Sequence, residues 1–164
     1  MSYGGSGAEW SILAGIFFVI WFAVLAFTVF VVLVVYVLNG FAFMRLFRKV
    51  GIEPWAAWVP IFINWRLLEL GGQPGWMSLL ALVSPGAIVT AVFEAIGSHR
   101  IGIAFRKPNS YVVLFIFLPF VWAFILGSDN EVYEPDLIRQ AGYTPPLAGV
   151  GSVAYAEARQ QPST

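Results

Sequence analysis

The sequence contains no cysteine, and this absence excludes several kinds of site at once. A chain without thiols forms no disulfide, holds no iron–sulfur cluster and offers no cysteine nucleophile. Its single histidine, His99, excludes a bis-histidine haem site and zinc sites built from several histidines within one chain. We therefore expect no metal site and no cofactor.

Charge is also scarce, because only 11% of the 164 residues are charged. A soluble domain has about 25% charged and about 45–50% apolar residues, whereas this chain is 59% hydrophobic with a mean hydropathy of +0.79. The net charge of zero argues against nucleic-acid binding, which needs a concentrated basic face. The composition predicts an all-α integral membrane protein whose main partner is the lipid bilayer.

Motifs of enzyme catalysis are missing as well. The sequence has no Walker motif, no GxGxxG and no spacing typical of metal ligands. A membrane signal peptidase would need a Ser–Lys dyad on the outer face, and the only two lysines, Lys49 and Lys107, are both expected in the cytoplasm. We predict no catalytic residues and no enzymatic activity.

What the chain does contain is a charge-free run over residues 10–44. About 20 apolar residues cross the hydrocarbon core, and only a helix satisfies its own backbone there. We predict a first span at about residues 10–40, after a short outer tail of residues 1–9. The positive-inside rule places the basic cluster that follows in the cytoplasm; this cluster is Arg45, Arg48 and Lys49.

Three further spans are predicted at residues 55–70, 76–105 and 110–126. The first of them is short, and Pro60 would bend it. It either crosses the membrane as a short bent helix or lies in the interface. Loop charge favours crossing, because the turn at residues 71–75 is uncharged and both basic clusters then stay in the cytoplasm. Four spans are therefore predicted, with three spans and an interfacial helix as the alternative.

Residues 128–164 differ from the rest of the chain in being polar, with five acids against two bases. A segment with so little apolar content cannot build a core, so we expect this tail to be disordered, with a short helix at residues 134–142 as a further option. The scarcity of basic residues places it outside, with the N-terminus.

Two sets of polar residues are candidate sites. Glu94 lies in the third predicted span, where a carboxylate costs a few kcal/mol and marks function by default, although it also lies near the cytoplasmic interface, where water would solvate it. Asn64, Arg66 and Glu69 lie in the second, where Arg66 and Glu69 can pair at i,i+3. These four residues either line a small polar cavity or serve as interface residues.

The two basic clusters are candidate contacts for anionic lipid headgroups. Their simpler role is to set the topology. The residues are Arg45, Arg48, Lys49, Arg100, Arg106 and Lys107.

The middle of the chain resembles an uncharacterised family of small bacterial multi-pass membrane proteins, most closely its actinobacterial members. The resemblance rests on residues 54–64 (PWAAWVPIFIN), 72–76 (GQPGW), 105–107 (FRK) and 118–120 (LPF), and it covers roughly residues 41–127. Relatives sometimes carry automatic labels such as signal peptidase or large exoprotein. The missing dyad contradicts the first label and the short chain the second, and the resemblance implies no catalytic residues.

Three classes of function remain. The leading hypothesis is a non-enzymatic accessory or scaffold subunit of a membrane assembly, with a membrane protein or further copies of the chain as partner. The alternative is a small oligomeric transporter or channel that uses Glu94 and Arg66. An intramembrane enzyme is the third. The expected location is the bacterial plasma membrane, with both termini outside.

Overall fold

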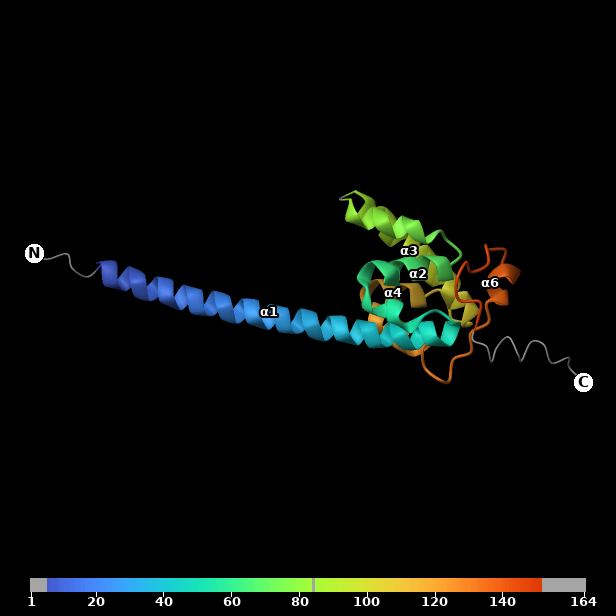
Figure 1. Ribbon diagram of the computed structural model, residues 1–164, viewed down its shortest axis with the longest axis horizontal. Coiled ribbons are helices and arrows are strands. Elements are labelled where there is room, and N and C mark those ends of the chain that lie inside the picture. Colours follow the sequence, from blue (N-terminus) through green and yellow to red (C-terminus); the bar gives the residue numbers. More distant parts are fainter. Residues whose placement is uncertain (1–5, 84, 152–164) are drawn as a thin grey trace, which may run out of the picture. The chain divides into compact units, whose positions relative to one another are not determined.

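The computed structural model describes residues 6–83 and 85–151, and within these residues it is helical and contains no strand (Figure 1). The chain divides into two units, residues 1–37 and residues 38–164. The all-α prediction is confirmed for the described part of the chain.

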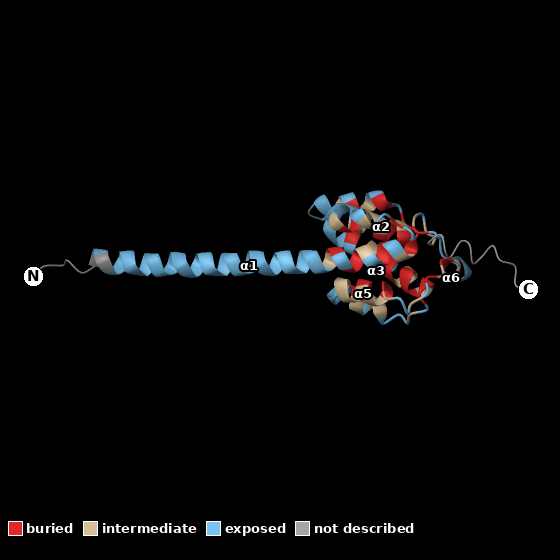
Figure 2. Ribbon diagram, turned by 60° about the horizontal axis from the view of Figure 1, so that its bottom comes forward, coloured by how far each residue is buried: buried red, intermediate tan, exposed pale blue. Residues whose placement is uncertain are grey.

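The first unit is the N-terminal part of helix α1, which extends over Ser6–Val50. All residues from 9 to 38 are exposed, including large apolar side chains such as Val19 at 70% and Phe27 at 68% (Figure 2). Exposure of so many apolar side chains is typical of a helix that contacts a membrane or a protein partner. The helix continues through Asn39 and Gly40, where the sequence analysis expected the first span to end.

The second unit has a core of its own, to which the last residues of α1 contribute Leu46, Phe47 and Val50, each 0% exposed. The other helices of this unit surround these residues (Figure 2). The 3-10 helices are η1 (Pro54–Trp58) and η2 (Gly75–Leu82), and the α-helices are α2 (Pro60–Leu70), α3 (Gly86–Ala104), α4 (Tyr111–Phe117), α5 (Pro119–Leu126) and α6 (Asp136–Gln140).

Each segment that was predicted as one helix consists of two helices that fold back on each other. Residues 55–70 form η1 and α2 (the first hairpin), residues 76–105 form η2 and α3 (the second hairpin), and residues 110–126 form α4 and α5 (the third hairpin). Each segment was expected to form a single span, bent at Pro60 in the first, whereas the structure contains two separate helices in each.

Side-chain contacts show the reversal in each hairpin. In the first, the ring centroids of Trp55 and Phe62 are 5.2 Å apart. In the second, the Thr90 hydroxyl donates to the Met77 carbonyl oxygen at 3.1 Å. In the third, the Phe115 and Trp122 centroids are 5.1 Å apart.

Proline causes the break in the first and third hairpins. Val59 is extended, with ψ 111°, and Leu118 is also non-helical, with ψ 65°; the next residue, Pro60 or Pro119, begins the second helix. A residue before proline is disfavoured in the α conformation, whereas proline itself suits the first helical position. In the second hairpin Pro85 directly precedes α3.

At the C-terminal ends of α2 and α3, the helix is terminated by a residue in the left-handed conformation. After α2, Gly72 has φ +72°, and Gln73 N–H donates back to the Leu68 oxygen at 2.8 Å. After α3, Arg106 has φ 55°, and Lys107 N–H donates to the Gly102 oxygen at 2.9 Å. These bonds satisfy the last carbonyl groups of each helix, so the turns after α2 and α3 are fixed in geometry.

The tail is part of the fold up to residue 151. Ile138 of α6 is 0% exposed and Tyr133 is 4% exposed, and both belong to the core. The prediction of disorder from residue 128 was therefore wrong for residues 128–151, because a few apolar side chains suffice when they join a core that other segments build. The remaining residues, 152–164, lie outside the described residues.

Only two of the described helices are long and apolar enough to cross a membrane, namely Glu9–Val50 with hydropathy 3.0 and Gly86–Ala104 with hydropathy 1.3. Length and composition of two helices give weak support for a membrane location. The count of four spans is not confirmed.

The packing of the tail into the core leads to a stability prediction. Ile138→Ala should lower the free energy of unfolding by about 2–5 kcal/mol, because it leaves a cavity in the core, whereas Leu147→Ala, at a side chain that is 58% exposed, should change it little. Denaturant unfolding in detergent micelles measures both. Equal stabilities for the two variants would contradict the packing of α6.

Candidate functional site

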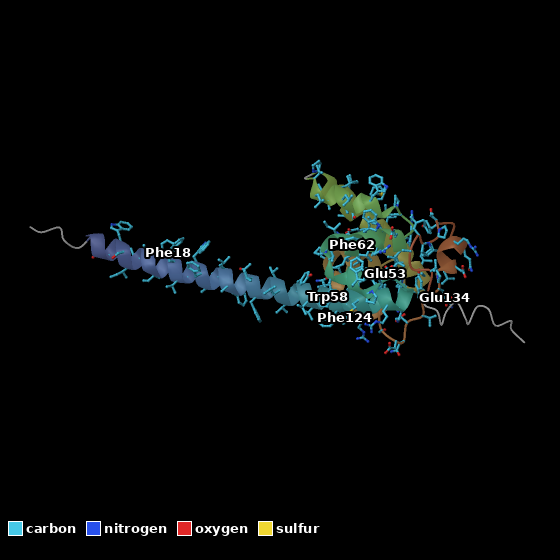
Figure 3. The ribbon with its side chains drawn as sticks, in the orientation of Figure 1. Phe18, Glu53, Trp58, Phe62, Phe124 and Glu134 are labelled. Carbon is cyan, nitrogen blue, oxygen red and sulfur yellow. The ribbon has the colours of Figure 1, made fainter. Side chains whose placement is uncertain are left out.

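The predicted pair of Arg66 and Glu69 is present, and a third residue joins it. Arg66 Nη1 is 2.7 Å from Glu69 Oε2, and Arg66 Nη2 is 3.1 Å from Glu53 Oε2. Trp65 Nε1 donates to Glu69 Oε1 at 2.8 Å. Figure 3 shows Glu53 at the start of the first hairpin. The network therefore ties the entry of this hairpin to its returning helix, and Asn64 lies half-buried on the same helix.

Glu94 is not part of that network. Its Oε1 atom is buried and meets no hydrogen-bond partner among the residues that the structure describes. Within residues 6–83 and 85–151, neither Arg66 nor Arg100 forms an ion pair with it. The four predicted polar residues thus separate into a bonded pair, Arg66 with Glu69, Asn64 on the same helix, and Glu94, which lies apart from them.

Lys49, which was predicted as a lipid contact, instead points into the protein. Its Nζ donates to the carbonyl oxygens of Leu126 at 3.1 Å and Glu131 at 2.9 Å, and also to that of Ser128. All three acceptors lie at or just after the end of α5. The last turn of α1 is therefore tied to the end of the third hairpin.

Lys107 also faces an internal partner. Its Nζ is 2.6 Å from Glu131 Oε1 and 5.3 Å from the centre of the Tyr111 ring. The side chains of Lys107 and Glu131 are only 18% and 21% exposed, so this pair is better shielded than a surface ion pair. It joins the start of the third hairpin to the tail.

Arg100 also contacts the protein itself, through a hydrogen bond and a cation–π contact. Its Nη1 donates to the Gly71 carbonyl oxygen at 3.1 Å, and its guanidinium lies 5.1 Å from the centre of the Tyr143 ring. The end of the second hairpin is thereby connected both to the end of the first and to the tail.

The six predicted lipid contacts therefore fall into two groups. Lys49, Arg100 and Lys107 are partly buried and bonded to the protein, whereas Arg45, Arg48 and Arg106 are exposed. Arg106 pairs with Glu134 at 2.9 Å on the surface. The exposed group is therefore better placed to meet a headgroup, and within it Arg106 also has Glu134 as a partner.

The sequence analysis missed the acidic partners of these cations. Glu131 and Glu134 were assigned to a disordered tail on the other side of the membrane, yet both bond to the basic residues after α3. The available signal was the acidic composition of residues 129–136, which is complementary to the basic cluster before the third hairpin.

This arrangement is a set of hydrogen bonds and ion pairs that hold distant segments of the fold together. Among the described residues, no group of three or more His, Asp or Glu side chains could hold a metal ion. Each partly buried cation instead connects two segments that are distant in sequence. We call the set of Lys49, Arg100, Lys107 and Glu131 the polar base of the second unit.

Substitution of Lys49 tests the polar base. Lys49→Met keeps the apolar stem but leaves three carbonyl oxygens without their charged donor, so the free energy of unfolding should fall by about 1.5–3 kcal/mol. Arg48→Met, at an exposed neighbour, is the matched control and should change it by less than about 0.5 kcal/mol. Denaturant unfolding in micelles gives both values, and equal losses would contradict the bonded role of Lys49.

Comparison with known proteins adds one finding. No curated protein and no solved structure matches the chain. Residues 55–135, which cover the three hairpins and include Glu131 of the polar base, are identified as a domain of a family of unknown function (DUF5684).

Proposed function

We propose that the protein is a non-enzymatic membrane protein that serves as an accessory or scaffold subunit of a membrane assembly, with the bacterial plasma membrane as its location. The observation that supports this proposal most strongly is the use of its partly buried cations. Lys49, Arg66 and Lys107 all bond to the protein itself, and each joins segments of the fold. Such charges favour a rigid body over a site that exchanges protons or ions.

The exposed part of α1 provides the anchor for such a subunit. Its apolar side chains from residue 9 to residue 38 are all exposed, and a helix of this length exceeds the hydrocarbon thickness of about 30 Å. A long apolar helix joined to a unit with its own core is well suited to hold that unit at a membrane.

A small oligomeric transporter or channel is the second candidate, and Glu94 favours it. An unpaired buried carboxylate oxygen in a chain of this composition is costly, so a transported cation would offer it a partner. Arg66 supports this candidate less, because both Glu53 and Glu69 neutralise it.

One pair of measurements separates the two candidates. The tagged protein, extracted from its native membrane in mild detergent, should co-purify with another membrane protein in fixed stoichiometry. The purified protein in liposomes should show no proton or cation flux, and Glu94→Gln should behave as the unsubstituted protein does. A flux that Glu94→Gln abolishes, with the variant still folded, would establish the transporter and refute the scaffold.

A further inference from the structure

We propose that the three hairpins enter the membrane from one side only, with their turned ends among the lipid acyl chains of the cytoplasmic leaflet. In this arrangement α1 makes the single crossing and the tail stays in the cytoplasm. The proposal is independent of whether the protein is a scaffold or a transporter.

Both ends of the first and third hairpins, and the C-terminal end of the second, lie at the polar base or beside it. The first hairpin follows directly after α1, where Ile52 N–H donates to the Phe47 oxygen at 2.8 Å, and it ends at Gly71, whose oxygen accepts from Arg100 near the end of the second hairpin. The third begins at Tyr111 beside Lys107 and ends at Leu126 beside Lys49. A segment whose two ends lie together does not cross a bilayer.

The tail provides the strongest constraint. Glu134 N–H donates to the Ala104 oxygen at 2.9 Å, Leu147 N–H to the Glu69 oxygen at 2.8 Å, and Gly151 N–H to the Val50 oxygen at 3.1 Å. Four spans would place the tail and the turn after Glu69 outside, but Ala104 and Val50 in the cytoplasm. Groups on opposite faces are separated by about 30 Å of hydrocarbon, so these bonds require all of them on one side.

The turned ends of the hairpins, where the chain reverses between the two helices, are apolar, in contrast to the polar base. They expose large apolar side chains, among them Leu82 at 69%, Ile88 at 73% and Phe117 at 76%. Exposed apolar surface beside a bonded polar base marks a site of contact with a membrane or a partner.

The dimensions suit one leaflet. With 7 to 11 residues each, α2, η2, α4 and α5 are about 10–17 Å long, which is close to half of the hydrocarbon core of about 30 Å. In α3, Gly97, Ser98 and Ile101 are buried in the protein, and residues 86–96, which contain its exposed apolar side chains, are about 16 Å long.

The backbone at the turned ends is compatible with hydrocarbon. Irregular backbone in lipid needs internal partners, and here Ile63 N–H donates to the Val59 oxygen, Gly86 N–H to the Val83 oxygen, and Trp122 N–H to the Leu118 oxygen, at 2.7–3.1 Å. The prolines that begin α2 and α5 have no N–H to satisfy.

A contact with α1 supports lipid as the environment of the turn of the first hairpin. Trp58, at the turn of the first hairpin, packs on Phe41 with ring centroids 5.3 Å apart, and Gly40 lies under its ring (Figure 3). Phe41 belongs to the charge-free run, whereas the polar base lies at the level of Lys49. The turn of the first hairpin is thus level with Phe41, and the exposed Arg45, Arg48 and Arg106 are placed for anionic headgroups.

Cysteine labelling tests the sidedness directly, since the chain has no native cysteine. Single variants at exposed positions are Gly7→Cys, Pro74→Cys, Asn109→Cys and Gln140→Cys. In intact bacterial cells an impermeant maleimide should label only Gly7→Cys, and permeabilisation should make all four reactive. Labelling of Pro74→Cys and Gln140→Cys in intact cells, with Asn109→Cys protected, would overturn the proposal in favour of four spans.

Spin labels test the lipid contact in the full chain. In phosphatidylcholine–phosphatidylglycerol liposomes, nitroxides at Leu82→Cys and Phe117→Cys should collide with oxygen at least several-fold more than with a nickel chelate, and one at Asn109→Cys should show the reverse. High nickel access at Leu82 and Phe117 would mean that water covers these ends. Low access to both reagents would mean that a protein or a second copy covers them. Either result refutes insertion among acyl chains.

Discussion

The ion pair between Lys107 and Glu131 is the interaction on which the arrangement of the second unit most depends. It joins the turn after α3 to the segment after α5, and Lys49 binds the carbonyl oxygen of the same Glu131. A few charged side chains thereby hold together the ends of the hairpins, the third of which contains no charged residue itself. Because these cations are partly shielded from water, their bonds to the protein contribute more than surface pairs would.

The second constraint is proline at the turns. A helix cannot continue unchanged through Pro60 or Pro119, and in both places the chain reverses. In the first and third hairpins the result is pairs of helices that are each too short to cross a bilayer. The proposals of a scaffold role and of one-sided insertion both rest on the division between apolar turned ends and bonded polar ends.

Sequence reasoning identified the helical class, the long apolar helix and the pair of Arg66 with Glu69, because each follows from composition or from local spacing. It failed at the hairpins, since Pro60 was interpreted as a bend and hydropathy is the same for a crossing helix and for two helices folded back. It also separated Glu131 from Lys107, because the positive-inside rule assigns sides from loop charge and contains no information about contacts between distant segments.

The most direct test is cross-linking of residues 106 and 134 in native membranes, which leaves the ion pair between Lys107 and Glu131 intact. In the doubly substituted chain Arg106→Cys, Glu134→Cys, a short bis-maleimide should join the two thiols within one chain, because the native side chains meet at 2.9 Å. The pair Leu82→Cys, Glu134→Cys is the control and should not be joined, because Leu82 lies at a turned end. Failure to cross-link residues 106 and 134, with both thiols reactive in detergent, would contradict the account.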